Sequence, residues 1–340
     1  MTLHFTADDV RALATEDMAM VAARAAVQAE SDGEALVLPR IDIPTPRGFL
    51  RVMAGRFRNF GGMKTMSMTR GVGNRYLLTV YDLTDGDVLA ILDADEVTRV
   101  RTAATTAVAA DTLIGSDSPT RLGIIGSGFE AAAHLRILVR RYPITEVCVF
   151  SRSPERRASF VTRMSRELGI VVESAPSPES AVTDMPLVCL ATKDTAPVVD
   201  GAAFAPGAVV LSIGSTRPDL RELDDVAFAR SSVVLVDSVR NVIEESGDVR
   251  SALAHNVITQ SDLVSMAQAA TEMPPERRGG TLKVFKSVGT ALQDLALAAA
   301  IIQTADGRGR QLGELAVLKP AEAAAGALLT SAPTKNGETL

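Results

Sequence analysis

The chain has 340 residues and a formal net charge of −6, so it is long enough for two domains and lacks the basic stripe that a nucleic-acid groove requires. It contains no apolar run of membrane-spanning length, and residues 1–30 carry acids where a signal peptide would be apolar. We therefore expect a soluble, cytoplasmic protein that binds neither nucleic acid nor a membrane.

The two cysteines and three histidines are too scattered for a metal site. Cys148 and Cys189 both fall in stretches predicted to be buried strands, so we interpret them as small core residues. The sequence predicts no metal and no histidine-activated nucleophile.

The N-terminal stretch predicts two helices. Thr6 and Thr15 are of the type that caps helix N-termini, and apolar residues at helical spacing follow Thr15 over 16–30. Gly33 is expected to end the second helix.

Residues 39–70 have a strand-like pattern and are unusually cationic. The cations are Arg40, Arg47, Arg51, Arg56, Arg58, Lys64 and Arg70. We expect Arg47, Arg51, Arg56 and Arg58 to form a solvated face.

A hairpin and a helix follow this cationic stretch. Two β-rich runs, 75–83 and 88–92, flank the turn at Asp85-Gly86. Residues 95–112 then predict a helix of small residues, which permit close approach of another backbone or a ligand.

The central motif is Gly126-Ser-Gly128-Phe-Glu-Ala131, which follows the apolar run 122–125. Such glycines allow a tight turn and close approach to a pyrophosphate, and a helix starting near Phe129 would direct its free N–H groups at the phosphates. We assign Gly126, Ser127, Gly128, Phe129 and Glu130 to a dinucleotide site.

The sequence after this motif alternates strands and helices, as in a doubly wound parallel sheet. Strands are predicted over 146–150, 187–191, 208–213 and 233–236, and helices over 154–168, 178–182 and 222–229. We predict an α/β protein whose Rossmann-type, NAD(P)-binding domain covers 118–290.

The second predicted domain is an α+β substrate-binding and dimerisation domain built from both chain ends, 1–117 and 291–330. A helix over 290–304, in which Asp294 is the only acid, is expected to return and pack on the N-terminal part. Residues 316–340 look weakly ordered, with 331–340 a flexible tail.

Several motifs, in matching order, resemble the ornithine cyclodeaminase/mu-crystallin family. They are Gly62-Met-Lys64, the run 88–104, Gly126 to Ala131, Arg217-Pro-Asp-Leu-Arg-Glu-Leu, Glu245-Ser-Gly-Asp248 and Phe285-Lys-Ser-Val-Gly-Thr-Ala. The resemblance covers about 5–305 and implies an NAD(P)-dependent homodimer. It also implies that Arg40, Lys64 and Arg101 hold a substrate carboxylate, which suits bidentate guanidinium pairing and a nearby point charge.

Two departures from the cyclodeaminase pattern are informative. Cyclodeaminases carry an acid in a Gly-x-Asp-x-Pro turn, whereas this chain has Thr216, which cannot titrate near neutrality but can orient water or substrate. Ketimine reductases of the mu-crystallin type resemble the chain better here. Glu130 replaces the glutamine that is usual after the glycines.

The end of the second Rossmann strand predicts the cofactor. Ser151-Arg152-Ser153 contains no acid to hold the ribose of NAD, whereas Ser151 and Arg152, helped by Arg156 or Arg157, can donate to a 2′-phosphate. We expect NADP(H) to be preferred and NAD(H) to be accepted. The remaining assignments are Thr192, Ser212, Ile213, Gly214 and Ser287 to the cofactor and Val288 to the substrate.

The leading hypothesis is an NAD(P)H-dependent reductase of a small α-imino acid, a ketimine, with Lys64, Arg101 and Thr216 in the catalytic set. The alternatives are a cyclodeaminase that uses NAD catalytically on ornithine or a related diamino acid, and an amino-acid dehydrogenase. A third is a non-catalytic, mu-crystallin-like protein that binds the cofactor or another ligand. No motif fixes the substrate's side chain, whose pocket we expect to be lined by apolar positions within 36–70.

Overall fold

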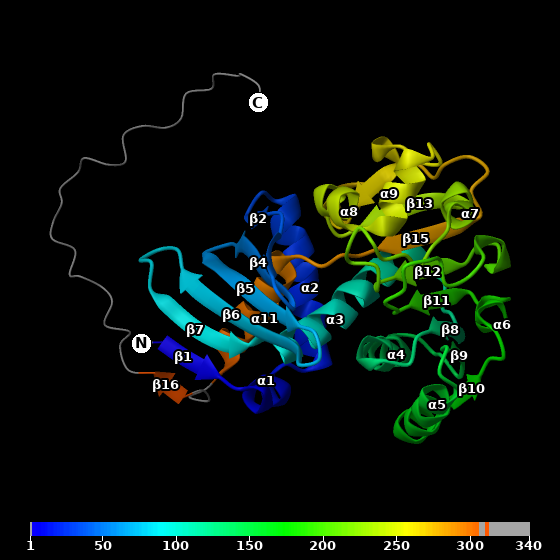
Figure 1. Ribbon diagram of the computed structural model, residues 1–340. Coiled ribbons are helices and arrows are strands. Elements are labelled where there is room, and N and C mark those ends of the chain that lie inside the picture. Colours follow the sequence, from blue (N-terminus) through cyan, green and yellow to red (C-terminus); the bar gives the residue numbers. More distant parts are fainter. Residues whose placement is uncertain (1, 306–309, 313–340) are drawn as a thin grey trace, which may run out of the picture.

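The computed structural model describes residues 2–305 and 310–312, and within them the chain forms two eight-stranded sheets (Figure 1). The first sheet has the order β16-β1-β7-β6-β5-β4-β2, with β3 paired to β4. Its strands are β1 Thr2–Phe5, β2 Ala35–Val37, β3 Ile41–Thr45, β4 Gly48–Phe57, β5 Phe60–Thr69, β6 Gly73–Asp82, β7 Val88–Asp93 and β16 Arg310–Leu312. The hairpin of β6 and β7 confirms the predicted pair of strands.

Four helices accompany this first sheet. They are α1 Ala7–Leu13, α2 Glu16–Ser31, α3 Ala94–Ile114 and α11 Ala291–Thr304. The Thr6 side chain accepts from the backbone of Asp9 in a capping box, and Thr15 caps α2 through the backbone N–H of Met18. The predicted return of the C-terminal helix is confirmed, because α11 packs against α2, α3, β4 and β5.

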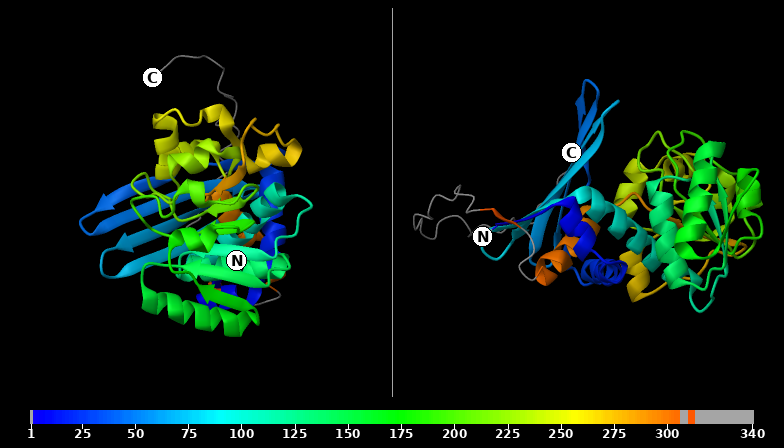
Figure 2. Two further views of the ribbon diagram at one scale, coloured as in Figure 1. Left: turned by 90° about the vertical axis from the view of Figure 1, so that its right-hand side faces the viewer. Right: turned by 90° about the horizontal axis from the view of Figure 1, so that it is seen from below.

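Among the residues that the structure describes, no element covers the opposite face of the first sheet (Figure 2). The large apolar side chains exposed on its strands are Leu36, Ile41, Ile43, Leu50, Met63 and Leu77, of which Ile41 is 63% exposed. Since side chains alternate between the faces of a strand, the residues on this open face are not covered by the helices.

The second sheet is parallel throughout and has the order β10-β9-β8-β11-β12-β15-β13-β14. Its strands are β8 Arg121–Ile125, β9 Glu146–Phe150, β10 Val171–Ser174, β11 Leu187–Leu190, β12 Val209–Ser212, β13 Ser231–Val236, β14 Leu263–Ser265 and β15 Leu282–Lys286. The accompanying helices are α4 Phe129–Arg141, α5 Pro154–Leu168, α6 Pro178–Val182, α7 Asp225–Ala229, α8 Val239–Glu245, α9 Gly247–Ala254 and α10 Met266–Thr271. The strand order reverses between β9 and β11, on either side of β8, as a Rossmann-type sheet requires.

The sequence did not predict strand β15, although it lies between β12 and β13 near the middle of the sheet. Two lysines obscured it, because a central strand normally consists of apolar residues. The structure satisfies both charges. Lys283 donates to the carbonyl of Leu113, and Lys286 forms an ion pair with Asp248.

Cys189 is fully buried and Cys148 half-buried, and both thiols are free, which fits the predicted core role. Among the described helices, none is both long and apolar enough to cross a membrane. The predicted tail, 316–340, lies outside the described residues.

Candidate functional site

The turn after β8 is shaped by two glycines. Gly126 has φ 131°, a backbone conformation that residues with a side chain rarely adopt. A Cβ at this position would also lie 2.6 Å from the carbonyl oxygen of Ala191 and would collide with that oxygen. Gly128 is the N-cap of α4, has open space where a Cβ would be, and gives α4 no side-chain cap. The first N–H groups of α4 therefore remain available for a phosphate, as a dinucleotide cofactor requires.

The end of β9 lies beside this turn. The Ser127 hydroxyl donates to the Ser151 hydroxyl at 2.9 Å, which joins the glycine turn to the second strand. Arg157 donates to the Ser151 carbonyl at 2.8 Å and stacks over the ring of Phe150, so it supports the loop from within. Ser153 caps α5.

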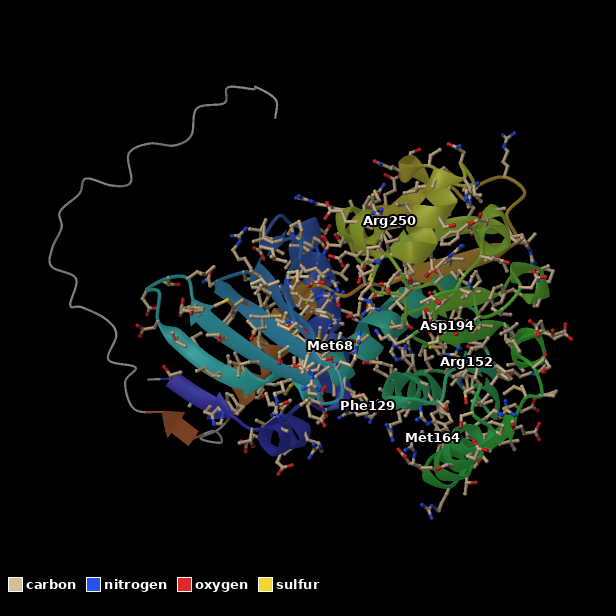
Figure 3. All side chains as sticks on the ribbon, in the orientation of Figure 1. Met68, Phe129, Arg152, Met164, Asp194 and Arg250 are labelled. Atoms are coloured by element: carbon tan, nitrogen blue, oxygen red, sulfur yellow. The ribbon has the colours of Figure 1, made fainter. Side chains whose placement is uncertain are left out.

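Arg152 forms an ion pair with Asp194, with 2.8 Å between Nη1 and Oδ2 (Figure 3). Asp194 follows β11, so the pair connects the loops that follow β9 and β11, on the two sides of β8. The Arg152 side chain is 79% exposed and remains accessible to a ligand. Arg156 is exposed on the first turn of α5.

The loops after β11 and β12 lie on the other side of β8 from the loop after β9. Lys193 donates to the Thr216 hydroxyl at 3.2 Å, so an ammonium group accompanies the threonine that stands at the cyclodeaminase acid position. Thr192 is half-buried, whereas Ile213 and Gly214 are buried. Ser212 is fully buried, and its hydroxyl donates to Glu222 beneath the loops.

Glu130 lies on the first turn of α4 with its side chain 37% exposed. Its backbone carbonyl bonds to Nδ1 of His134 at 2.7 Å, and burial lowers the pKa of His134. The lowered pKa favours the neutral imidazole, so His134 adds no positive charge beside the first turn of α4.

Lys64 of β5 is buried, and its ammonium lies 2.6 Å from Oδ2 of Asp294 on α11. It also donates to the Thr98 hydroxyl at 3.2 Å. Burial lowers the pKa of Lys64 to about 8, with Asp294 opposing the shift and Arg101 adding to it. This places the ammonium's titration near neutrality, in the range a proton donor needs.

Arg101 of α3 shares the same acid. Its Nε donates to Oδ1 of Asp294 at 2.8 Å, and its Nη1 donates to Gln293 at 2.6 Å. One fully buried carboxylate therefore holds two of the predicted substrate-binding cations, Lys64 and Arg101, side by side.

Arg40 is the third predicted cation. Its Nε lies 2.6 Å from a carboxylate oxygen of Glu245, and its Nη2 donates to the carbonyls of Val288 and Gly289. Burial lowers the pKa of Arg40 and raises that of Glu245 to about 7. Val288, predicted to contact substrate, thus contributes its carbonyl to the positioning of Arg40.

The turn after β15 joins these cations to the carboxyl edge of the parallel sheet. Asp237, at the end of β13, accepts from the Ser287 hydroxyl at 2.7 Å and from the backbone of Val288 and Gly289. Gly289 has φ 81°, and a Cβ there would lie 3.0 Å from Nη1 of Arg101. The Ser287 hydroxyl is therefore used inside the protein, and Gly289 leaves the space beside the Arg101 guanidinium that a side chain would crowd.

The prediction for Arg51 was wrong. Its side chain is 8% exposed and makes a bidentate ion pair with Asp42, its partner in the β3–β4 register, with both N–O distances 2.6 Å. The burial brings a fourth cation, Arg51, close enough to Arg40 to lower its pKa.

Sequence reasoning missed the acids that partner the cations: Asp294, Glu245, Asp194 and Asp42. It also missed Asp237, which holds the turn after β15. Asp294 did carry a signal, as the only acid in an Ala-rich helix. Glu245 stands in one of the quoted motifs, but nothing in the sequence pairs it with Arg40.

Comparison with known proteins places this site in context. The model of the ornithine cyclodeaminase/mu-crystallin family matches residues 2–309. The chain is 30% identical over 277 residues to ketimine reductase mu-crystallin of Mus musculus, covering 78% of this chain and 84% of that protein. It is 30% identical over 304 residues to Delta(1)-pyrroline-2-carboxylate reductase of Paracoccus denitrificans, covering 84% and 93%.

Among solved structures, the Delta(1)-pyrroline-2-carboxylate reductase of Thermococcus litoralis in complex with NADH and L-proline superposes with a TM-score of 0.84. The match has 25% sequence identity and covers 91% of this chain and all of that chain.

Proposed function

Because this chain belongs to the ornithine cyclodeaminase/mu-crystallin family and is an NAD(P)-dependent oxidoreductase, we propose that it reduces a small α-imino acid. Three buried cations, Arg40, Lys64 and Arg101, meet at the carboxyl edge of the Rossmann sheet, and this arrangement carries the proposal. Domain 118–290 would hold the cofactor. Residues 1–117 with 291–330 would hold the substrate, although 306–309 and 313–330 lie outside the described residues.

The cofactor would lie across β8, its pyrophosphate at the glycine turn and the free N-terminus of α4. The nicotinamide, once bound, supplies the hydride that reduces the imine carbon. The protein's role is to hold the substrate's carboxylate so that the imine carbon faces the nicotinamide ring.

Arg40 and Arg101 would bind the carboxylate, since guanidinium groups fix both its position and its plane. Each is preorganised by an acid, Glu245 for Arg40 and Asp294 for Arg101, so little side-chain freedom is lost on binding. Lys64, from β5, adds a third positive charge.

Lys64 would also supply a proton where the substrate is a neutral imine. Reduction of a neutral imine adds hydride to carbon and a proton to nitrogen, whereas a protonated iminium needs only hydride. The lowered pKa of Lys64, about 8, makes its ammonium a competent donor near neutrality. Thr216, held by Lys193, would orient water or substrate without titrating.

We propose that NADPH is preferred over NADH. The support is the absence of an acid in Ser151-Arg152-Ser153 and the exposure of the Arg152 guanidinium. Asp194 competes for Arg152, so the preference is expected to be moderate.

A homodimer formed through the open face of the first sheet is part of the proposal. Exposed apolar side chains lie on four neighbouring strands, β3 to β6. They are Ile41, Ile43, Leu50, Met63 and Leu77. A second copy of the chain would cover them, because monomeric proteins rarely expose large apolar patches.

The proposal is tested by NADPH oxidation in the presence of pyrroline-2-carboxylate, piperideine-2-carboxylate, or pyruvate with ammonia or methylamine. We expect turnover with at least one of these substrates. Lys64→Ala should lower kcat about 10²- to 10⁴-fold while thermal unfolding stays cooperative, because Asp294 keeps its ion pair with Arg101. Wild-type rates in Lys64→Ala would contradict the role of this residue.

Assays with ornithine and with amino acids, together with cofactor-binding measurements, separate the alternatives. Ammonia release from ornithine without net change in cofactor absorbance would indicate cyclodeamination. Amino-acid oxidation without imine reduction would indicate a dehydrogenase. Tight NADPH binding with no turnover on any substrate would indicate a binding protein.

A further inference from the structure

The loops at the ends of β11 and β12 rest on a buried charged cluster that takes no direct part in the proposed reaction. The cluster consists of Lys286, Glu222 and Asp248, and none of the three has exposed surface. Each stands in a different one of the family motifs, and the structure brings the three motifs together.

Glu222 connects the two loops. Its Oε1 accepts from the backbone N–H of Thr192 at 2.6 Å and from the Thr192 hydroxyl at 2.9 Å. Its Oε2 accepts from the backbone N–H of Gly214 at 2.7 Å and from the Ser212 hydroxyl at 2.8 Å. Two backbone N–H groups and two hydroxyls therefore surround one carboxylate. Burial raises the pKa of Glu222, and the nearby Lys286 ammonium opposes that shift by favouring the ionised form.

Gly214 is packed directly against the other loop. A Cβ there would lie 1.7 Å from the carbonyl oxygen of Thr192 and 2.5 Å from Oε1 of Glu222. The ends of β11 and β12 therefore pack against each other, and the Glu222 carboxylate accepts hydrogen bonds from both.

Lys286 and Asp248 hold Glu222 in turn. The Lys286 ammonium lies 3.0 Å from Asp248, donates to the Ser212 hydroxyl at 2.9 Å and lies 3.8 Å from Glu222. Asp248 also accepts from the backbone N–H groups of Glu222 and Leu223. The lysine balances buried negative charge, and Asp248 fixes the backbone from which Glu222 projects.

We propose that Glu222 is a positioning residue for the nicotinamide half of the cofactor, held in place by Lys286 and Asp248. The inference rests on the proposed cofactor site. The two halves of a dinucleotide lie on opposite sides of the central strand, and the 2′-phosphate end belongs to β9. The loops after β11 and β12 therefore face the nicotinamide half, and Glu222 fixes their spacing before the cofactor arrives.

The test compares two ligands in Glu222→Gln. The full cofactor NADPH would contact the loop after β9 and also the loops after β11 and β12. Adenosine 2′,5′-bisphosphate would contact only the loop after β9. The amide cannot accept all four hydrogen bonds, so we expect NADPH to bind about tenfold more weakly and kcat to fall, with adenosine 2′,5′-bisphosphate binding within about twofold of wild type. Dissociation constants would come from calorimetry.

The matched control is Asp111→Asn. Asp111 lies at the far end of α3 and also accepts from several side chains, namely Arg24, Arg141 and Tyr142. The Asp111→Asn variant should bind NADPH and adenosine 2′,5′-bisphosphate with wild-type affinities. Ser212→Ala is a milder variant for the case that Glu222→Gln does not fold. It removes the hydroxyl that lies between Lys286 and Glu222. We expect it to weaken NADPH binding by a smaller factor and to leave the binding of adenosine 2′,5′-bisphosphate unchanged.

Equal weakening of both ligands, or no weakening of either, would overturn the inference. Failure of the wild-type protein to bind NADPH and NADH would instead overturn the proposed function itself, and the inference with it. Wild-type binding thus separates the two outcomes.

Discussion

The Lys64 ammonium and the Asp294 carboxylate lie 2.6 Å apart, joining β5 near one end of the chain to α11 near the other. Both side chains are buried, and Asp294 has no exposed surface. Because Asp294 also holds Arg101, it fixes the spacing of two cations from different elements.

This relationship predicts the pH dependence of turnover. The protonated form of Lys64 is the active one for a neutral imine, so kcat should fall as the pH rises through about 8. In Asp294→Asn the negative charge that raises the pKa of Lys64 is lost, so the same decline should occur at lower pH.

The measurement is kcat against pH with pyrroline-2-carboxylate in the wild type, Asp294→Asn and the control Asp111→Asn. The control should keep the wild-type profile. An unchanged inflection in Asp294→Asn would show that Lys64 is not the titrating group.

A second prediction concerns cofactor selectivity. Arg152→Ala should remove roughly ten- to a hundredfold of NADPH affinity, the contribution of a charge-assisted contact to the 2′-phosphate. Asp194→Asn should strengthen NADPH binding, because it frees Arg152 and removes a negative charge near the phosphate. Ser151→Asp should reverse the preference by repelling the phosphate and accepting from the ribose of NADH.

Dissociation constants for NADPH and NADH, taken as a ratio, test this assignment. Arg163→Ala is the control, since Arg163 is exposed on α5 away from the loop. If Arg152→Ala left the ratio unchanged, the loop would not bind the 2′-phosphate.

A third prediction concerns Glu30 of α2, which lines a cavity of about 10 Å³ together with Asp237 and Thr290. Burial, and the charge of Asp237, raise the pKa of Glu30 to about 7. Since its folded-state pKa lies above its ordinary value, Glu30 reduces stability as the pH rises from about 4.5 to 7.

Glu30→Gln should therefore be more stable than the wild type at pH 8, by on the order of 1–3 kcal/mol, and the difference should shrink toward pH 5. Urea unfolding of both proteins at several pH values measures this difference in the free energy of unfolding. The exposed Glu179→Gln should show no such trend. A pH-independent difference for Glu30→Gln would rule out the raised pKa.

A fourth prediction concerns the open face of the first sheet. Light scattering of the wild type should give twice the chain mass of 35.8 kDa. Leu77→Glu combined with Ile41→Glu should give the monomer, because two charges would be buried in the interface. Val226→Glu, at a comparably exposed position on α7, should remain dimeric. A monomeric wild type would contradict the proposed interface.

Local chemistry in the sequence was sufficient for much of the architecture. The bounds of α5, α6 and β9 agree with the prediction, because Ser153 and Ser177 cap the helices and the strand is an apolar run. The glycine turn was also predicted from the sequence, since Gly126 adopts a positive φ that favours glycine. These features depend on neighbours in the chain or on a property of one residue.

The tertiary structure alone decided which charges pair. Nothing in the sequence connects Lys64 with Asp294 or Arg40 with Glu245, because the partners are far apart in the chain and one acid resembles another. Arg51 shows the same limit. Its strand pattern was read correctly, but its burial follows from Asp42 lying opposite it on β3. An ion's environment is set by the elements that pack around it, and only the folded chain brings those elements together.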